Sequence, residues 1–214
     1  MSPRRARPGQ VIAVYPGTFD PVTNGHVDII ERGSRLFDKV LVAILENPEK
    51  DPMFTVRERM SLIQASTRHL GNVEVEAFAG LLIDYARARK VRAIVRGLRA
   101  VSDFEYELQM AMMNRRLSSE VETVFMMPNE AYSYLSSRLV REVVALGGSV
   151  TGLVPKEVES RIVQRAGTIR RRLGSAPHGA PGGEGSAVGA TGTGKTRGRL
   201  ARRQGRRPAK GKRR

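Results

Sequence analysis

Residues 15–26 read YPGTFDPVTNGH and place a glycine, hydroxyls and a histidine directly after a short apolar run. At the end of a buried strand, a glycine such as Gly17 lets backbone amides approach a phosphate closely. A helix that begins behind it adds free N–H groups and its positive dipole end, and His26 in the first turn can point at a phosphate oxygen. The pattern predicts a phosphate site; the alternatives are a turn that only joins strand to helix and a histidine that only caps the helix.

Two arginines add a second candidate anion site. Arg96 and Arg99 follow another apolar run, and arginines at the carboxyl end of a strand favour a phosphate or carboxylate ligand. The acids Asp103 and Glu105 come shortly after them. Ion pairing with either acid is therefore the alternative.

The elements that must position these residues alternate along the chain. Short β-branched runs predict buried strands at residues 11–15, 40–45, 73–77, 91–95 and 121–126. Helical spacing predicts helices at residues 27–37, 56–70, 81–90, 104–117, 135–146 and 155–172. Residues 55–58 (TVRE) and 102–105 (SDFE) have the capping-box form, which predicts helix starts. This alternation predicts an α/β fold: a doubly wound, Rossmann-like, five-stranded parallel sheet with helices on both faces.

The charge of the chain is concentrated at one end. The 214 residues carry a net charge of +16, but eleven bases and one acid after residue 174 contribute +10 of it, which leaves +6 for residues 1–174. Residues 174–214 are rich in Gly, Ala, Pro and Arg, a composition with little to bury. We expect a disordered N-terminal extension at residues 1–9, one domain at 10–173, and a disordered basic tail at 174–214.

Several classes of protein are excluded or disfavoured by composition. The chain has no cysteine, so it can form neither a disulfide nor a thiolate metal site. The N-terminal apolar run is too short for a signal peptide, and no run approaches the roughly 18 apolar residues of a membrane span. We therefore expect a cytoplasmic protein without a membrane span.

The tail contains a sequence that matches the pattern of an ATP-binding motif. Residues 189–196 (GATGTGKT) match the P-loop pattern G-x-x-x-x-G-K-[ST]. A P-loop needs a strand before it and a helix after it, and the sequence on both sides predicts neither, so we interpret the match as accidental. The tail could contact RNA, DNA or an anionic membrane without sequence specificity, because it has no aromatic residue for stacking. The alternative is a solvated, dispensable extension.

The motifs together resemble one enzyme family. Residues 15–26 resemble the T/HxGH signature of the nucleotidyltransferase superfamily, nearly letter for letter in the version of phosphopantetheine adenylyltransferases. Residues 47–54 (NPEKDPMF), 94–99 (IVRGLR) and 103–107 (DFEYE) resemble further segments of that family. The similarity extends over residues 10–173.

The resemblance implies a reaction. The 4'-phosphate of phosphopantetheine would attack the α-phosphate of ATP in line, giving dephospho-coenzyme A and pyrophosphate with no covalent enzyme intermediate. A phosphate is already ionised at neutral pH, so positioning and charge stabilisation suffice. The resemblance also implies Mg²⁺ held mainly by substrate phosphates and water, and a homohexamer. The alternatives are a related transferase acting on nicotinate mononucleotide or glycerol 3-phosphate, and a nucleic-acid-binding protein on an idle scaffold.

The resemblance also assigns roles to residues. It implies that His26 stabilises the transition state, helped by Thr18, Lys50 and Arg99. The resemblance implies that phosphopantetheine is bound by Thr18, Lys50, Leu82 and Arg96. It implies that ATP is bound by Thr18, Phe19, His26, Gly97, Leu98, Arg99, Glu107, Tyr132, Ser133, Tyr134, Leu135, Ser136, Ser137 and Arg138. Taken without the family, Ser136 and Ser137 are ordinary helix N-caps.

Two positions depart from the family pattern. Arg138 stands where relatives often have Ser or Thr, so its contact is open. Gly80 stands where relatives often have a polar residue, which leaves a backbone contact at Leu82 possible. The methionines at 110, 112 and 113 are expected to pack in the core or between subunits.

Overall fold

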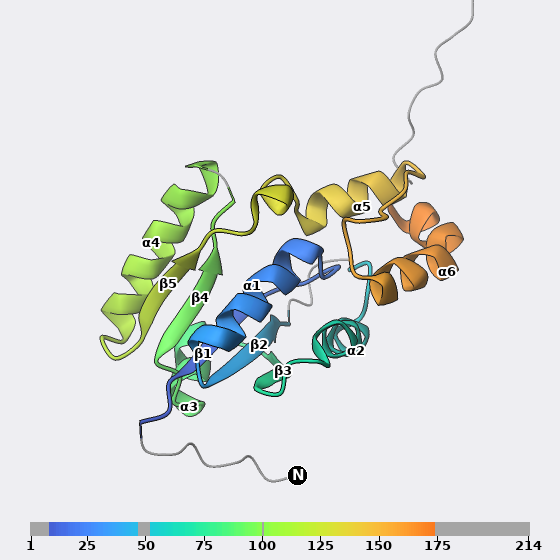
Figure 1. The fold of residues 1–214 in the computed structure, drawn as a ribbon. Helices are drawn as coiled ribbons and strands as arrows, with labels where there is room; N and C mark the ends of the chain where they lie inside the picture. The colour runs from blue at the N-terminus through green and yellow to red at the C-terminus, as the bar shows by residue number, and fades with distance from the viewer. Residues whose placement is uncertain (1–8, 47–51, 100, 174–214) are drawn as a thin grey trace, which may run out of the picture. The chain divides into compact units, whose positions relative to one another are not determined.

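Five parallel strands form the centre of the computed structural model, which describes residues 9–46, 52–99 and 101–173. The strands are β1 (Ile12–Gly17), β2 (Lys39–Leu45), β3 (Val73–Phe78), β4 (Ala93–Gly97) and β5 (Glu122–Met126). Their order in the sheet is β3-β2-β1-β4-β5, and every pairing is parallel. The predicted five-stranded parallel sheet is confirmed, and the strand order reverses direction between β1 and β4 (Figure 1).

Helices connect the strands and follow the last one. They are α1 (Asn24–Leu36), α2 (Val56–Thr67), α3 (Leu82–Ala88), α4 (Val101–Leu117), the short 3-10 helix η1 (Glu130–Tyr132), α5 (Ser137–Ala145) and α6 (Lys156–Leu173). No helix in the described part of the chain is long and apolar enough to cross a bilayer. The bounds differ from the predicted ones by a few residues at most ends.

Two buried clusters show which helices cover which face of the sheet. Alternate residues of β1 and β2 pack with residues of α1, α2, α5 and α6 in one cluster, and the remaining ones pack with α3 in the other. Phe125 of β5 contacts Phe104 of α4, with ring centroids 6.4 Å apart, whereas its neighbour Val124 packs against the first cluster. Because side chains alternate along a strand, α4 lies on the same face as α3. The predicted helices on both faces are confirmed.

The starts of two helices show where capping patterns succeed and fail. Thr55 caps α2 as predicted: its backbone N–H donates to Oε2 of Glu58 (3.0 Å), and the Glu58 N–H donates to Oγ1 of Thr55 (3.3 Å). The predicted cap at Ser102 is wrong, because α4 already includes Val101. Helix ends fray and their bounds vary by one or two residues, so the predicted and observed starts of α4 lie close together.

Some predicted features lie outside the described residues. They include Lys50, the N-terminal extension up to residue 8, the basic tail and the P-loop-like stretch at residues 189–196. The predictions about them stay predictions.

Candidate active site

A cavity of about 740 Å³ opens at the carboxyl ends of β1 and β4. Most of the predicted site residues line it: Thr18, Phe19, His26, Leu82, Arg96, Gly97, Arg99, Glu107, Tyr132, Leu135, Ser136 and Ser137. Of the predicted residues that the structure describes, four are not among its lining: Leu98, Ser133, Tyr134 and Arg138. The cavity lies at the switch point of the sheet, where open α/β folds bind ligands.

His26 both caps a helix and faces the cavity. It is the third residue of α1, and its Nδ1 accepts a hydrogen bond from the Thr23 backbone N–H (3.0 Å). In return, Oγ1 of Thr23 accepts from the His26 N–H (3.3 Å). A neutral imidazole has one donor and one acceptor nitrogen, so an accepting Nδ1 places the proton on Nε2. His26 can thus cap the helix through Nδ1 and still donate a hydrogen bond to a ligand through Nε2.

The surroundings of His26 keep its ring neutral. Burial of the ring, and secondly the positive charge of Arg99, lower its pKa from 6.5 to about 4. The Phe19 ring packs edge-on against it, with centroids 5.1 Å apart. At neutral pH the side chain is therefore an uncharged N–H donor. Since Nε2 already carries its proton, it is not available as a base.

The loop between β1 and α1 has an unusual backbone at Phe19. Phe19 has a φ of +47°, in the left-handed region that residues other than glycine rarely adopt. Its ring also packs edge-on against Tyr15, at 5.3 Å. A Cβ on Gly17 would lie 2.9 Å from this ring, so the glycine of the motif is required by close packing. The loop presents Thr18 at the wall of the cavity.

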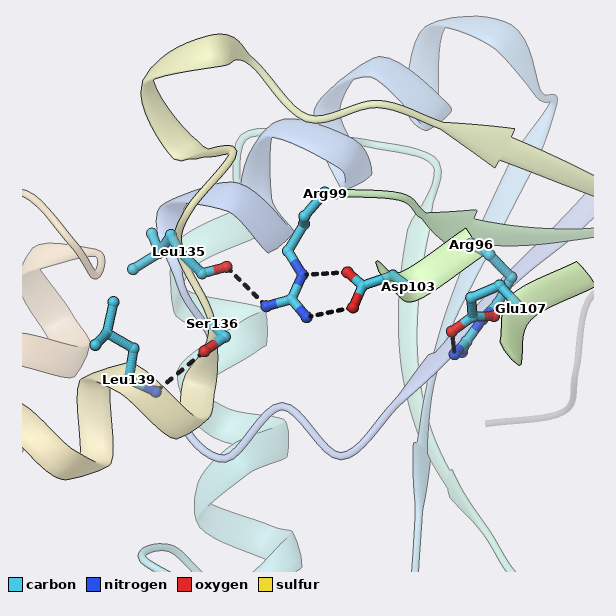
Figure 2. Close-up of polar contacts among 7 residues, drawn as sticks. All are labelled: Arg96, Arg99, Asp103, Glu107, Leu135, Ser136 and Leu139. Atoms are coloured by element: carbon cyan, nitrogen blue, oxygen red, sulfur yellow. Dashed lines mark hydrogen bonds and ion pairs between the residues drawn. The ribbon is translucent and has the colours of Figure 1, made fainter. Parts of the chain in front are cut away.

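Arg96 is held by an acid and by the loop after β1. Its Nε donates to Oε2 of Glu107 (2.7 Å), and its Nη2 also pairs with that carboxylate (Figure 2). Its Nη1 donates to the Pro16 carbonyl (3.0 Å). Burial alone would lower the pKa of Arg96, but the hydrogen bond and charge of Glu107 outweigh it and raise the pKa. Glu107, predicted to contact the nucleotide, thus orients Arg96 in this structure.

Arg99 is held in the same manner. Its Nε donates to Oδ2 of Asp103 (3.1 Å), and its Nη1 donates to the Leu135 carbonyl (3.1 Å) (Figure 2). Of the two acids considered from the sequence, Asp103 forms the ion pair and the exposed Glu105 does not line the cavity. Ion pairing and anion binding do not exclude each other here, because Arg96 and Arg99 both line the cavity while they are paired.

The start of α5 forms another part of the cavity wall. Ser136 is the N-cap, accepting at Oγ from the Leu139 N–H (3.0 Å), as expected from the sequence (Figure 2). The Ser137 hydroxyl donates to the Pro21 carbonyl (2.8 Å), which ties α5 to the loop after β1. Arg138 is exposed and pairs with Glu142 (2.9 Å).

One side of α4 forms a wall of the cavity, and the sequence predicted only Glu107 there as a binding residue. The other residues of this wall are Asp103, Tyr106, Met110, Ala111 and Asn114. These positions recur at a spacing of three and four residues, which places them on one face of a helix. That spacing is the sequence signal from which a shared wall could have been predicted. The apolar residues on the other sides of α4 obscured that signal. Met110, expected to serve packing only, lies at the cavity.

The fold and this site define a nucleotidyltransferase, and comparison with known proteins supports that class. Residues 14–143 match the model of the cytidylyltransferase-like family. The bifunctional NMN adenylyltransferase/ADP ribose pyrophosphatase from Francisella tularensis has a similar fold, with a TM-score of 0.60 at 15% identity over 77% of this chain and 52% of that one.

Sequence relatives narrow the class to one family. The phosphopantetheine adenylyltransferase of Natranaerobius thermophilus is 52% identical over 74% of this chain and 98% of its own. That of Alkaliphilus metalliredigens is 57% identical over 69% of this chain and 94% of its own. The chain belongs to the phosphopantetheine adenylyltransferase family, as the resemblance of its motifs implied.

The tautomer and pKa of His26 can be measured directly. We expect ¹⁵N NMR of the imidazoles to show a neutral Nε2–H tautomer for His26 at pH 7 and a titration midpoint near pH 4. In the urea-unfolded chain the same group should titrate near its ordinary value of about 6.5. Between these values the unfolded chain binds the proton more readily, so this group's contribution to stability declines as the pH falls from about 7 toward 4. A midpoint near 6.5 in the folded protein would contradict the assignment.

Proposed function

We propose that the protein transfers the adenylyl group of ATP to 4'-phosphopantetheine, producing dephospho-coenzyme A and pyrophosphate. The observation that carries this proposal is the neutral Nε2–H of His26 at a cavity that Arg96 and Arg99 also line. The identity to named phosphopantetheine adenylyltransferases supports the choice of acceptor.

The chemistry needs no protein nucleophile. An oxygen of the 4'-phosphate bonds to the α-phosphorus of ATP, and the bond from that phosphorus to the bridging oxygen breaks, so that the electron pair leaves with pyrophosphate. Negative charge grows on the α-phosphate oxygens, where the His26 Nε2–H can donate a hydrogen bond. Thr18 lies at the junction of the two substrates in this proposal, and Lys50 with Arg96 reduces the repulsion between them. Arg99 and the start of α5 hold the ATP phosphates.

We also propose that Mg²⁺ acts with the nucleotide. The residues present fit an ion carried by ATP: among the described residues, the two carboxylates that line the cavity, Asp103 and Glu107, are each bonded to an arginine. No group of three potential ligand side chains occurs among the described residues. Phosphate oxygens and water would therefore supply its ligands, since Mg²⁺ retains several waters. Bound there, the ion would neutralise phosphate charge.

Acceptor choice is tested by pyrophosphate release. We expect turnover with ATP and phosphopantetheine, and far less with nicotinate mononucleotide or glycerol 3-phosphate. The assay uses the full chain and a chain ending at Gly174, which should be equally active if the tail and its P-loop-like stretch take no part. No turnover with phosphopantetheine would refute the proposed function. Contact of the tail with polyanions and a cytoplasmic location stay predictions.

The role of His26 is tested by substitution. His26→Ala should lower kcat by about 10²- to 10³-fold, the usual loss on removing one preorganised donor to a developing oxyanion. ATP affinity should change little, because the donor acts mainly in the transition state. The exposed His69, on the loop after α2, provides a matched control in His69→Ala. A near-normal kcat in folded His26→Ala protein would remove His26 from the chemistry.

We propose that the protein is a homo-oligomer, a hexamer as the family resemblance implies, with α4 in the contact. Large apolar side chains are exposed on α4, including Phe104, Met112 and Met113, and Met112 is 65% exposed. Met112→Glu should lower the molar mass measured by light scattering at micromolar concentration. The control is Leu146→Glu at the end of α5, where an 80% exposed leucine lies outside α4. An unchanged mass in Met112→Glu would contradict a contact through this residue.

A further inference from the structure

One buried arginine has no part in the mechanism above. Arg59 on α2 is only 5% exposed, and its Nε has no hydrogen-bond partner among the described residues. Burial lowers its pKa, and the opposing influences of Asp20 and Glu46 do not restore it. A buried guanidinium with an unsatisfied N–H destabilises a fold compared with a well-packed apolar side chain. Stability alone therefore does not account for an arginine at this position.

Arg59 contacts the loop between β1 and α1. Its Nη1 donates to the backbone carbonyl of Thr18, at 2.6 Å. On the other side of Phe19, the carbonyl of Asp20 accepts a hydrogen bond from Arg141 of α5. Arginines from two different helices thus hold the two carbonyls that flank Phe19.

Asp20 ties the same loop to a third segment. Its Oδ2 accepts from the Met53 N–H (2.8 Å), and its Oδ1 accepts from the Phe54 N–H (2.9 Å). Asp20, Met53 and Phe54 are all buried, and Phe54 is completely so. These bonds hold the loop at Asp20, whereas the bond from Arg59 holds the peptide that follows Thr18.

Rotation of that peptide would change the positions of the two residues it joins, Thr18 and Phe19. Phe19 is held at a positive φ, a conformation that persists only where the surroundings impose it. Its ring lies edge-on to His26, and Thr18 just before it lines the cavity. If the Thr18 carbonyl lost its partner, the peptide could turn and move both neighbours.

We infer that Arg59 is a positioning residue for adenylyl transfer: by holding the Thr18 carbonyl it fixes Phe19, and through it the direction of Thr18 and His26 toward the cavity. This inference rests on the proposed function. Arg59 does not line the cavity and touches no reacting atom, so it acts only through the loop.

The test replaces the guanidinium with an apolar chain of similar length. Arg59→Met should lower kcat about 10- to 100-fold, the scale expected for a small misplacement of reacting groups, while the KM for ATP changes less than threefold. The midpoint of urea unfolding should stay near that of the unsubstituted chain. The control is Arg57→Met, at an exposed position two residues earlier in α2, which should leave kcat within twofold.

A second measurement separates positioning from a loss of folded protein. If Arg59 acts through the direction of His26, its replacement should cost much less in a His26→Ala background, because the effects of residues acting as a unit do not multiply. A loss of folded protein would reduce kcat by the same factor in both backgrounds. Equal factors would therefore overturn the inference.

A conservative variant covers the case in which Arg59→Met does not fold. Arg59→Lys keeps a charge but replaces the rigid planar donor with a flexible one, so kcat should fall about three- to tenfold. If Arg59→Met folds and its turnover is within twofold of that of the unsubstituted chain, the inference is overturned. If Arg59→Met does not fold, the same result in Arg59→Lys overturns it. Absence of turnover in the unsubstituted chain would instead refute the proposed function, so the two failures are distinguishable.

Discussion

The parallel pairing of β1 with β4 decides where this protein can bind its ligands. From β1 the chain builds outward through β2 to β3, and then returns to place β4 on the open side of β1. The connections that leave β1 and β4 therefore diverge, with α1 on one face of the sheet and α4 on the other. The space between the diverging connections is the cavity, and its position follows from strand order alone.

Charge at this edge of the sheet serves two purposes. Arg96 and Arg99 lie close in sequence, and each is held by its own carboxylate, which limits repulsion between them before an anion arrives. The charge of Arg99 also contributes to the lowered pKa of His26. Arg99, which we propose holds phosphate, thus helps to keep His26 neutral, so that His26 can donate a hydrogen bond without giving up a proton.

Much of the fold and site could be predicted from the sequence because the signals are local. Alternating apolar runs predicted the sheet, and the motif from Tyr15 to His26 predicted the loop and helix start that line the cavity. Apolar spacing alone placed the first helix at Val27, whereas the motif predicted His26 in its first turn. Hydrogen bonding starts the helix at Asn24 behind the Thr23 cap, so the motif, and not the apolar spacing, located the helix start correctly.

Other features depend on contacts between distant segments and had no local signal. The bond from Arg59 to the Thr18 carbonyl spans 41 residues, and within α2 Arg59 resembles any surface arginine. The pairing of Arg96 with Glu107 spans 11 residues and requires the turn between β4 and α4. The exposure of Arg138 likewise follows from its place on α5 and could not be read from its neighbours.

Helix α4 connects the cavity to the proposed oligomer contact. Glu107 on one side of α4 holds Arg96 at the cavity, while Met112, close to half a turn away around the helix, is exposed. A helix with apolar residues on several sides has no single orientation that buries them all within one chain. A second subunit against the outer side would restrict the rotation of α4 and, through Glu107, the placement of Arg96. Assembly and anion binding would then depend on the same helix.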